Sequence, residues 1–335
     1  MISEEFSPEI ESRLRKMAAD GTSVLVTGGS GYLGSMLVEM LVERGFKTTV
    51  VDNLAYGQNS LFNLFASGKL EFIHCDVTNE AFVKELMEKG SYDYIVPLAA
   101  IVGFPASEQR PEATWLVNHG SILTLLKYRK NGQKIIFPGS NSSYGTVGAT
   151  GEICTEESPL NPISTYGKTK IAAEKAVLDS GDAISFRIAT LFGFSQRMRT
   201  ESPVNNLVLK ASTDKTVVLS EHRSYKRNFL HVRDGARVFL WGMANWDKLK
   251  NGVYNVVLPD GNVSKEEIVA LIRKQMPGLN VCIAERDTDS DLRNYSMSCD
   301  KIVKAGFTFK YTLESGITEL INGYRAFRDY RFKNY

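Results

Sequence analysis

The sequence predicts an α/β protein with a doubly wound parallel sheet, followed by a smaller α/β region towards its C-terminal end. Short apolar runs rich in β-branched residues alternate with helical stretches as far as about residue 192. A glycine-rich turn separates the first such run from the first long helical stretch. Beyond residue 192 the alternation weakens, and a polar, basic stretch follows. Alternating strands and helices imply right-handed crossovers, so we expect helices on both faces of the sheet.

The predicted strands are short apolar runs bounded by glycine or polar residues. In chain order they cover residues 22–29, 47–53, 70–77, 92–100, 133–140 and 183–193. The predicted helices carry apolar residues at helical spacing, and several end at a glycine. They cover residues 32–45, 80–90, 112–132 and 165–181, then 262–278 and 312–327 in the C-terminal region. Residues 1–21 predict a further surface helix before the first strand.

Composition and charge argue against several classes of partner. The chain of 335 residues is 43% hydrophobic and 23% charged, which is typical of soluble globular proteins. Its net charge of +2 creates no overall field that would attract nucleic acid or an anionic membrane. No apolar run reaches the ~20 residues that span a membrane, and residues 1–21 lack the apolar core of a secretion signal. We therefore expect a cytoplasmic protein that binds neither nucleic acid nor membranes.

The cysteines and histidines are scattered, without a CxxC pair and without the spacing of metal ligands. They are Cys75, Cys154, Cys282 and Cys299, and His74, His119, His222 and His231. We expect neither a disulfide framework nor a metal site.

The stretch "TGGSGYLG" predicts a dinucleotide site. It places Gly28, Gly31 and Gly34 three apart between a predicted strand and a predicted helix. Such a turn lets the backbone approach a pyrophosphate, while the helix offers free N–H groups and a partial positive charge. Asp52 ends the next strand, where its carboxylate would bind the adenosine ribose and repel a 2′-phosphate. No arginine follows in "DNLAYG", so the sequence favours NAD over NADP.

Strand order adds further residues to this Rossmann-type site. Asp76 and Val77 are expected near the adenine, and Leu98 to Ala100 beside the cofactor. The full set of expected cofactor contacts is Gly28, Gly31, Tyr32, Leu33, Gly34, Asp52, Asn53, Asp76, Val77, Leu98, Ala99, Ala100, Tyr166 and Lys170.

A second stretch, "STYGKTK", suggests acid–base chemistry. Tyr166 and Lys170 are four residues apart, so they share a face of the predicted helix. Free tyrosine has a pKa of about 10, and a nearby ammonium favours the phenolate. "PGSNSSYG" ends the fifth predicted strand, where topology places the ligand cleft. Ser140 or Ser142 could hold a substrate hydroxyl there.

Together these motifs resemble the extended short-chain dehydrogenase/reductase family, in its branch of nucleotide-sugar epimerases and dehydratases. "RIATLFG" and "KRNFLHVRDGARVF" also resemble that family's "R-x-x-N-x-x-G" and "R-D-F-I-H-V-x-D" segments. The resemblance extends over essentially the whole chain past residue 21. It implies an NAD-binding domain over residues 1–191, with a returning segment near 227–257, and a nucleotide-sugar-binding domain over 192–335. It also implies a homodimer formed through the helix that carries "YGKTK".

The resemblance implies roles for individual residues. Tyr166 matches the family's base, Lys170 its lysine on the cofactor ribose, and Ser140 its catalytic serine, with Ser142 or Ser143 as alternatives. Arg227 matches an arginine that meets the substrate diphosphate. Further expected substrate contacts are Asn141, Ser142, Thr190, Asn206 and Arg293, and secondary candidates for the diphosphate are Arg197, Arg199 and Arg223.

The family's shared first step moves a hydride from a sugar carbon, usually C4, to NAD. Dehydratases carry an acid after the catalytic Ser/Thr, and this chain has Asn141 and Ser142 there, so dehydration is disfavoured. An epimerase returns the hydride to the opposite face, whereas a dehydrogenase releases the 4-keto sugar.

Thr190 and Asn228 depart from the asparagine and aspartate of UDP-galactose 4-epimerase. They favour resemblance to the group that oxidises C4 of a GDP-heptose for surface polysaccharide. A 4-epimerase is the main alternative. A 4-keto reductase and a non-catalytic NAD sensor are the others.

Overall fold

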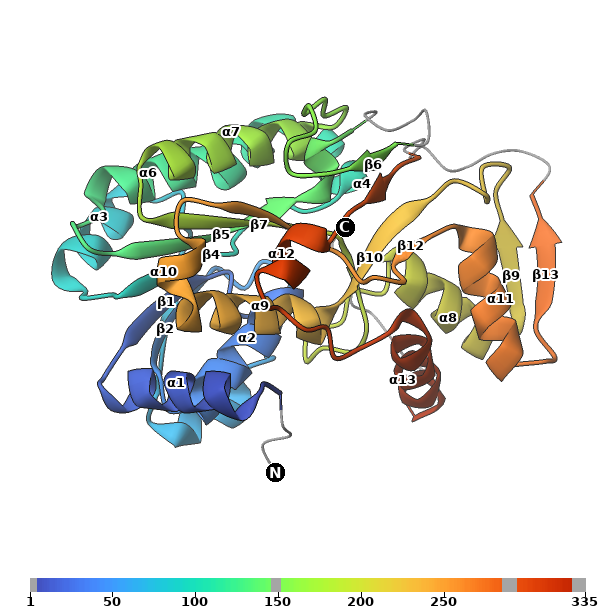
Figure 1. Cartoon of the computed structure of the whole chain (residues 1–335), viewed down its shortest axis with the longest axis horizontal. Helices are drawn as coiled ribbons and strands as arrows, with labels where there is room; N and C mark the ends of the chain where they lie inside the picture. Colours follow the sequence, from blue (N-terminus) through green and yellow to red (C-terminus); the bar gives the residue numbers. More distant parts are fainter. Residues whose placement is uncertain (1–4, 146–151, 285–293, 327–335) are drawn as a thin grey trace.

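A seven-stranded parallel sheet forms the centre of the protein, and helices cover both of its faces (Figure 1). The computed structural model describes residues 5–145, 152–284 and 294–326. The strand order is β11-β7-β5-β4-β1-β2-β3. The strands are β1 (Ser23–Thr27), β2 (Lys47–Asp52), β3 (Leu70–His74), β4 (Tyr94–Pro97), β5 (Lys134–Ser140), β7 (Ala183–Ile188) and β11 (Val253–Val256). The predicted doubly wound α/β class is therefore confirmed.

Two helical layers sandwich the sheet, because successive residues of each buried strand point to opposite faces. One layer holds α1 (Pro8–Ala19), α2 (Tyr32–Glu43) and α9 (Val232–Ala244). The other holds α3 (Glu80–Lys89), α6 (Ser121–Tyr128) and α7 (Thr165–Asp179). Val26 and Ile136 pack in the core cluster of the first layer, and Leu25 and Phe137 in that of the second.

The remaining elements gather beside the carboxyl edge of the sheet, on the right of Figure 1. The helices there are α8 (Pro203–Thr213), α11 (Lys265–Gln275) and α13 (Leu313–Ala326). Small sheets join β12 (Asn262–Val263), β10 (Arg227–His231) and β8 (Thr190–Phe192), and β13 (Asn280–Ile283) with β9 (Thr216–Leu219). A third joins β14 (Ser296–Met297) with β6 (Ile153–Cys154). The domain boundary near residue 191 stays a prediction.

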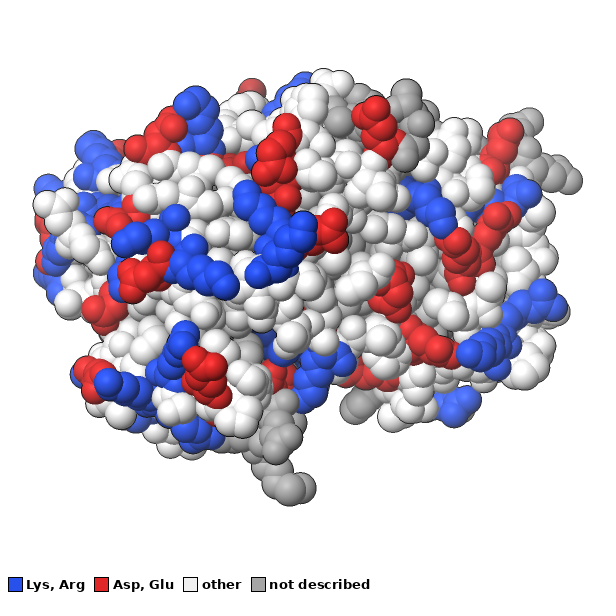
Figure 2. Space-filling view, viewed as in Figure 1, with Lys and Arg blue, Asp and Glu red and all other residues white. Residues whose placement is uncertain are grey.

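The shorter helical elements complete the chain. They are η1 (Phe62–Ser67), α4 (Phe104–Gln109), α5 (Pro111–Trp115), η2 (Leu116–Gly120), η3 (Asn141–Ser143), α10 (Trp246–Leu249) and α12 (Asp300–Lys304). Over the described residues, no helix combines the length and apolarity needed to cross a bilayer. Acidic and basic side chains are interspersed over the face shown in Figure 2.

The single strand predicted over 183–193 is wrong. The chain leaves the large sheet after β7, at Ala189, whose N–H still donates to Val256 O. It then forms β8, which pairs with β10 in a different sheet. Gly193 ends this segment with φ +106°, a conformation that glycine adopts without strain. An apolar run shows that residues are buried, but it does not show which sheet they join.

The helix predicted over 112–132 ends earlier, at Tyr128, because Arg129 adopts extended backbone (φ −62°, ψ 132°). Its middle is the π-helical turn η2. Asn118 in that turn accepts a hydrogen bond from Ile101 N (2.8 Å) and donates one to Ile101 O (3.0 Å). It also donates to Thr169 Oγ1 on α7 (3.2 Å). The π turn thus ties α7 to the segment that follows β4.

A buried ion pair fixes α7 on the sheet. Arg187 on β7 and Glu174 on α7 lie 2.7 Å apart, and their side chains are 6% and 5% exposed. Glu174 also accepts from Ser185 Oγ (2.6 Å), and Arg187 donates to Tyr144 Oη (3.0 Å). The charges are therefore paired and hydrogen-bonded, which a buried ion pair requires.

Replacing one partner of this pair should be far more costly than replacing both. We expect Arg187→Met to lower the free energy of unfolding by about 3–5 kcal/mol, because it leaves the Glu174 carboxylate buried and unpaired. The double variant with Glu174→Met should recover most of that loss. Urea denaturation of the three proteins measures both effects, and a loss below about 1 kcal/mol in the single variant would contradict the argument.

Candidate active site

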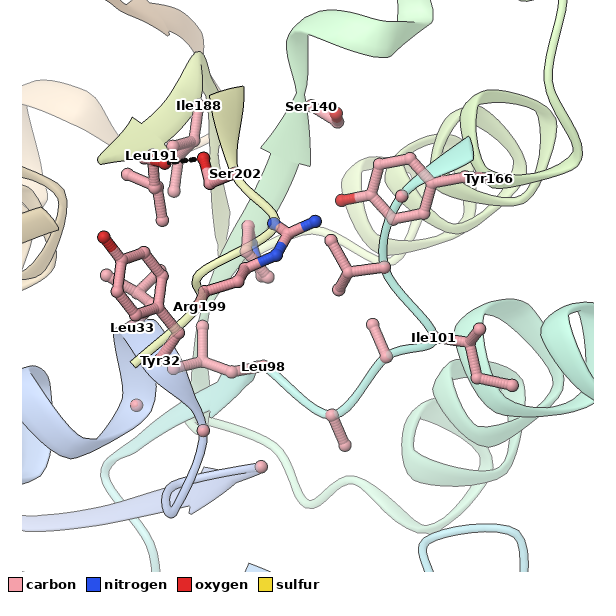
Figure 3. A pocket seen from close by; sticks show the side chains of 18 of the residues that line it. Tyr32, Leu33, Leu98, Ile101, Ser140, Tyr166, Ile188, Leu191, Arg199 and Ser202 are labelled. Atoms are coloured by element: carbon pink, nitrogen blue, oxygen red, sulfur yellow. Dashed lines mark hydrogen bonds between the residues drawn. The ribbon is translucent and has the colours of Figure 1, made fainter. Parts of the chain in front are cut away.

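One large cavity of about 660 Å³ opens at the carboxyl edge of the sheet, within the range of ordinary ligand sites. Its walls are the glycine-rich turn, the ends of the neighbouring strands, the first turn of α7 and the segment after β8. Figure 3 shows the Tyr166 hydroxyl and the Arg199 guanidinium projecting into it. The topology therefore places the predicted site where open parallel sheets bind ligands.

The glycine-rich turn packs so closely against neighbouring backbone that it has no room for side chains. A dinucleotide can therefore approach the backbone of the turn directly. A Cβ on Gly28 would lie 2.6 Å from Ala99 N, and Gly28 itself has φ +70°. A Cβ on Gly34 would lie 2.3 Å from Gly28 O. Helix α2 begins here without a side-chain cap and without an acid in its first turn. Its free N–H groups can therefore receive an anion.

The end of the cavity where we expect the adenosine, called the adenosine end, is ordered around Asp52. One carboxylate oxygen accepts from Ser30 N (2.9 Å), and the other from Leu54 N (2.9 Å) and Gln58 Nε2 (3.2 Å). Burial raises the pKa of Asp52, and the two backbone donors act in the opposite direction. A carboxylate has about four acceptor positions, so one remains for a ribose hydroxyl.

Asp76, two residues after the end of β3, lies at the same end and accepts a hydrogen bond from Asn53 Nδ2 (2.8 Å). The guanidinium of Arg197 lies 4.6 Å from the ring centroid of Tyr56, and both residues line the cavity with Asp52. The sequence offered Arg197 only as a secondary diphosphate candidate. The structure places Arg197 beside Tyr56, and its contact with a diphosphate stays a prediction.

The first turn of α7 presents the expected base. Ser164 caps the helix by accepting from Gly167 N (3.1 Å), which starts the helix one residue before Tyr166. The Tyr166 side chain then projects into the cavity, opposite the end of β5 (Figure 3). Lys170 follows one turn later and lines the same cavity.

The serines reach α7 because residue 167 has no side chain. A Cβ on Gly167 would lie 2.7 Å from Ser142 O, so η3 packs directly on the helix. Ser140 Oγ accepts from Ser142 N (3.1 Å), which leaves the Ser140 hydroxyl hydrogen free to donate to a ligand. Ser140, Asn141 and Ser142 line the cavity. Ser143 is buried and is not among the lining residues.

Lys170 occupies an apolar position. It is 4% exposed, and its ammonium lies 4.3 Å from the ring centroid of Phe137. Burial lowers the pKa of Lys170 to about 7, and Glu174 offsets part of that effect. The charge on this lysine is thus only partly favoured before ligands bind.

The end of the cavity where we expect the substrate, called the substrate end, holds Thr190, Arg227 and Lys265. Sequence reasoning missed Lys265. The capping box of Ser264 and Glu267 predicts that a helix starts there, but it does not predict that the start of this helix is turned towards the cavity. Asn206 does not line the cavity: it lies on α8 beside Asn205, which binds Tyr32 Oη instead.

Two further arginine predictions have different outcomes. Arg223 pairs with Glu266 (2.5 Å) outside the cavity. Arg293 falls outside the described residues.

Asn228 replaces the aspartate expected at its position and changes the local hydrogen bonds. Its buried amide donates to Asn262 Oδ1 (2.8 Å) and to Tyr295 O (2.9 Å), which a carboxylate could not do. Tyr295 Oη donates in turn to Asn141 O (2.7 Å), next to Ser140. The departure therefore supports the backbone of the serine segment.

The cavity as a whole favours anions. Its basic lining residues are Arg110, Lys170, Arg197, Arg199, Arg227 and Lys265, and its acidic ones are Asp52, Asp76 and Glu201. In the part of the chain that the structure describes, no group of three or more His, Cys, Asp or Glu side chains could hold a metal ion. The lining thus suits phosphorylated ligands.

The chain is similar to known proteins over most of its length. The family model described as "NAD dependent epimerase/dehydratase family" matches residues 24–256, more than half of the chain. A UDP-glucose 4-epimerase of Corynebacterium glutamicum is 26% identical over 270 residues, which cover 75% of this chain and 79% of that protein.

Two solved structures share the fold. The UDP-Glc/GlcNAc 4-epimerase of Campylobacter jejuni gives a TM-score of 0.78 at 22% identity, over 91% of this chain and 100% of that one. The dTDP-glucose 4,6-dehydratase DesIV of Streptomyces venezuelae, solved with NAD, gives 0.79 at 22% identity, over 92% and 98%.

The buried lysine should make stability depend on pH. The folded-state pKa of Lys170 is about 7, and an unfolded lysine titrates near 10.4. Between these values the unfolded chain binds the additional proton, so the free energy of unfolding should rise with pH. From pH 7 to pH 9 we expect cofactor-free wild type to gain about 2 kcal/mol relative to Lys170→Met.

Urea denaturation at several pH values measures this difference. Lys168→Met, which removes an exposed lysine from the same helix, is the matched control and should follow wild type. A constant difference between wild type and Lys170→Met across this range would show that Lys170 titrates normally.

Proposed function

Because the chain belongs to the NAD dependent epimerase/dehydratase family, we propose that it oxidises a hydroxyl of a nucleoside diphosphate sugar, at C4, to a 4-keto sugar. The observation that carries this proposal is the projection of Tyr166 into the cavity, opposite Ser140 and one turn before Lys170. This arrangement supplies a base, a cation beside it and a hydroxyl donor in one place.

The chain's own residues divide the work of this reaction. Ser140 donates its hydroxyl hydrogen to the sugar oxygen and orients it, and Tyr166 takes the proton from the hydroxyl that is oxidised. The Lys170 ammonium favours the phenolate form of Tyr166. Bound NAD supplies the hydride acceptor, and the glycine-rich turn and Asp52 would hold it.

Elimination of water is not part of this proposal. A dehydratase needs an additional acid close to the reacting sugar, and residues 140–143 contain none. Among the described lining residues, the carboxylates are Asp52 and Asp76 at the adenosine end, and Glu201, which pairs with Arg199.

Two fates of the 4-keto sugar have separate support. Release of the keto sugar, as in a 4-dehydrogenase acting on a GDP-heptose, is supported by Thr190 and by the amide network of Asn228. Return of the hydride to the opposite face, as in a 4-epimerase, is supported by the relative in Corynebacterium glutamicum.

A cytoplasmic location, supported by the four free cysteines, completes the proposal, and cell fractionation tests it.

Tyr166→Phe tests the base directly. We expect turnover to fall about 10²- to 10⁴-fold, because only the proton acceptor is lost, while NAD binds as in wild type. The assay uses a panel of UDP-, GDP- and dTDP-sugars, including a GDP-heptose, and measures both NADH and sugar products. Net NADH or keto sugar identifies a dehydrogenase, and a new epimer without net redox change identifies an epimerase. Near-wild-type turnover in the variant would remove Tyr166 as the base.

We also propose a homodimer formed across the helices beside α7. Trp115, Leu116 and Leu123 are 42%, 55% and 46% exposed there, which leaves apolar area that a second copy would cover. Leu116→Glu with Leu123→Glu should yield a monomer in sedimentation experiments. Phe62→Glu changes an exposed apolar residue on η1 and should leave the dimer intact. A monomeric wild type at micromolar concentration would refute the proposal.

A further inference from the structure

The segment between β8 and α8, residues 193–202, lies against the first turn of α2; we call it the arginine loop. Tyr32 Oη donates to Gly193 O (2.6 Å), and Ser195 Oγ donates to Tyr32 O (2.7 Å). Ser35 Oγ and Ser195 Oγ lie 2.9 Å apart. All three contacts hold the loop on the helix that begins at the glycine-rich turn.

Asn205 fixes the far half of the loop to the same point. Its side-chain N–H group donates to Arg199 O (2.9 Å) and to Tyr32 Oη (3.1 Å), and its oxygen accepts from Gly193 N (3.0 Å). Asn205 is fully buried. The backbone of Arg199 is therefore positioned relative to the start of α2.

The Arg199 side chain extends from this loop towards the opposite wall of the cavity. Its Nη2 lies 3.1 Å from the position that a Cβ of Gly103 would take, in the segment that follows β4. Figure 3 shows the guanidinium between the start of α2 and Tyr166. It thus lies across the middle of the cavity.

Glu201 orients the Arg199 side chain but binds only one of its N–H groups. Arg199 Nε donates to Glu201 Oε1 (2.8 Å), and the two side chains are 18% and 7% exposed. Among the described residues, no acceptor binds the terminal nitrogens of Arg199, and Glu201 Oε2 is buried without a donor. A purely structural ion pair would have this buried carboxylate oxygen paired as well.

The terminal nitrogens of Arg199 are turned into the cavity and can bind an anion, which either of two diphosphates could supply. The substrate's diphosphate has Arg227 and Lys265 at its own end of the cavity. The cofactor's diphosphate is expected at the N-terminus of α2, the helix to which the arginine loop is bound. This attachment favours the cofactor.

We propose that Arg199, aimed by Glu201, binds the cofactor's diphosphate from the side opposite the glycine-rich turn and slows its release. The N–H groups of α2 and the guanidinium then enclose the anion from two sides. This role concerns the cofactor alone, so it holds whether the keto sugar is released or reduced again.

Direct binding measurements test the proposal. Arg199→Gln should weaken NAD binding roughly 10- to 100-fold, mainly through faster dissociation, which stopped-flow fluorescence of NADH measures. Glu201→Gln should have a smaller effect in the same direction. The control Arg223→Gln, which alters an arginine outside the cavity, should match wild type.

A second measurement separates the two anions. With NAD saturating, the affinity of Arg199→Gln for UDP or GDP should equal that of wild type by calorimetry. Unchanged NAD affinity, or a loss confined to the nucleoside diphosphate, would overturn the proposal. Should Arg199→Gln not fold, Arg199→Lys keeps the charge but cannot bind Glu201 and a diphosphate together. It should still release NADH several-fold faster than wild type, and an unchanged rate would equally overturn the proposal.

Discussion

The site depends on a cation that the protein places where water cannot stabilise it. Lys170 lies against Phe137 in a nearly closed position, so its charge is only partly favoured in the free protein. A phenolate at Tyr166, or hydroxyl groups of a ligand that accept from Lys170, would favour the charged form of Lys170. In the proposed reaction, the Lys170 ammonium and the Tyr166 base therefore work only together, and only when α7 is held in one place.

Two features hold that helix. The Glu174–Arg187 pair fixes α7 to β7, and the missing side chain of Gly167 lets η3 pack against its first turn. The same kind of close approach, at Gly28 and Gly34, brings the start of α2 to the end of β4. The glycine-rich turn, Tyr166 and Ser140 are therefore positioned by contacts between rigid elements, which is how catalytic geometry is kept within a few tenths of an ångström.

How much of this could be predicted depends on how local each signal is. The glycine turn, Asp52 and the Tyr166–Lys170 spacing lie within single strand–turn–helix units, so the sequence predicted both their existence and their place at the cavity. The break at Ala189 depends on pairing between β8 and β10, which are distant in sequence. Arg199 and Lys265 are likewise positioned by contacts between distant segments, and no local pattern shows that they reach the cavity. Asn206 does not line the cavity; the apolar pattern of α8 does not show which face of that helix is turned towards the cavity.

Because residue 228 is asparagine where an aspartate was expected, this region differs in charge as well as in hydrogen bonding. Asn228 is fully buried beside the serine segment, where a carboxylate would be weakly screened and would repel a dianionic diphosphate nearby. An amide keeps acceptor capacity and adds two donors, which here bind Asn262 and Tyr295 O. Tyr295 in turn supports the backbone of Asn141. The segment that carries Ser140 therefore has a neutral, hydrogen-bonded support in place of a buried charge.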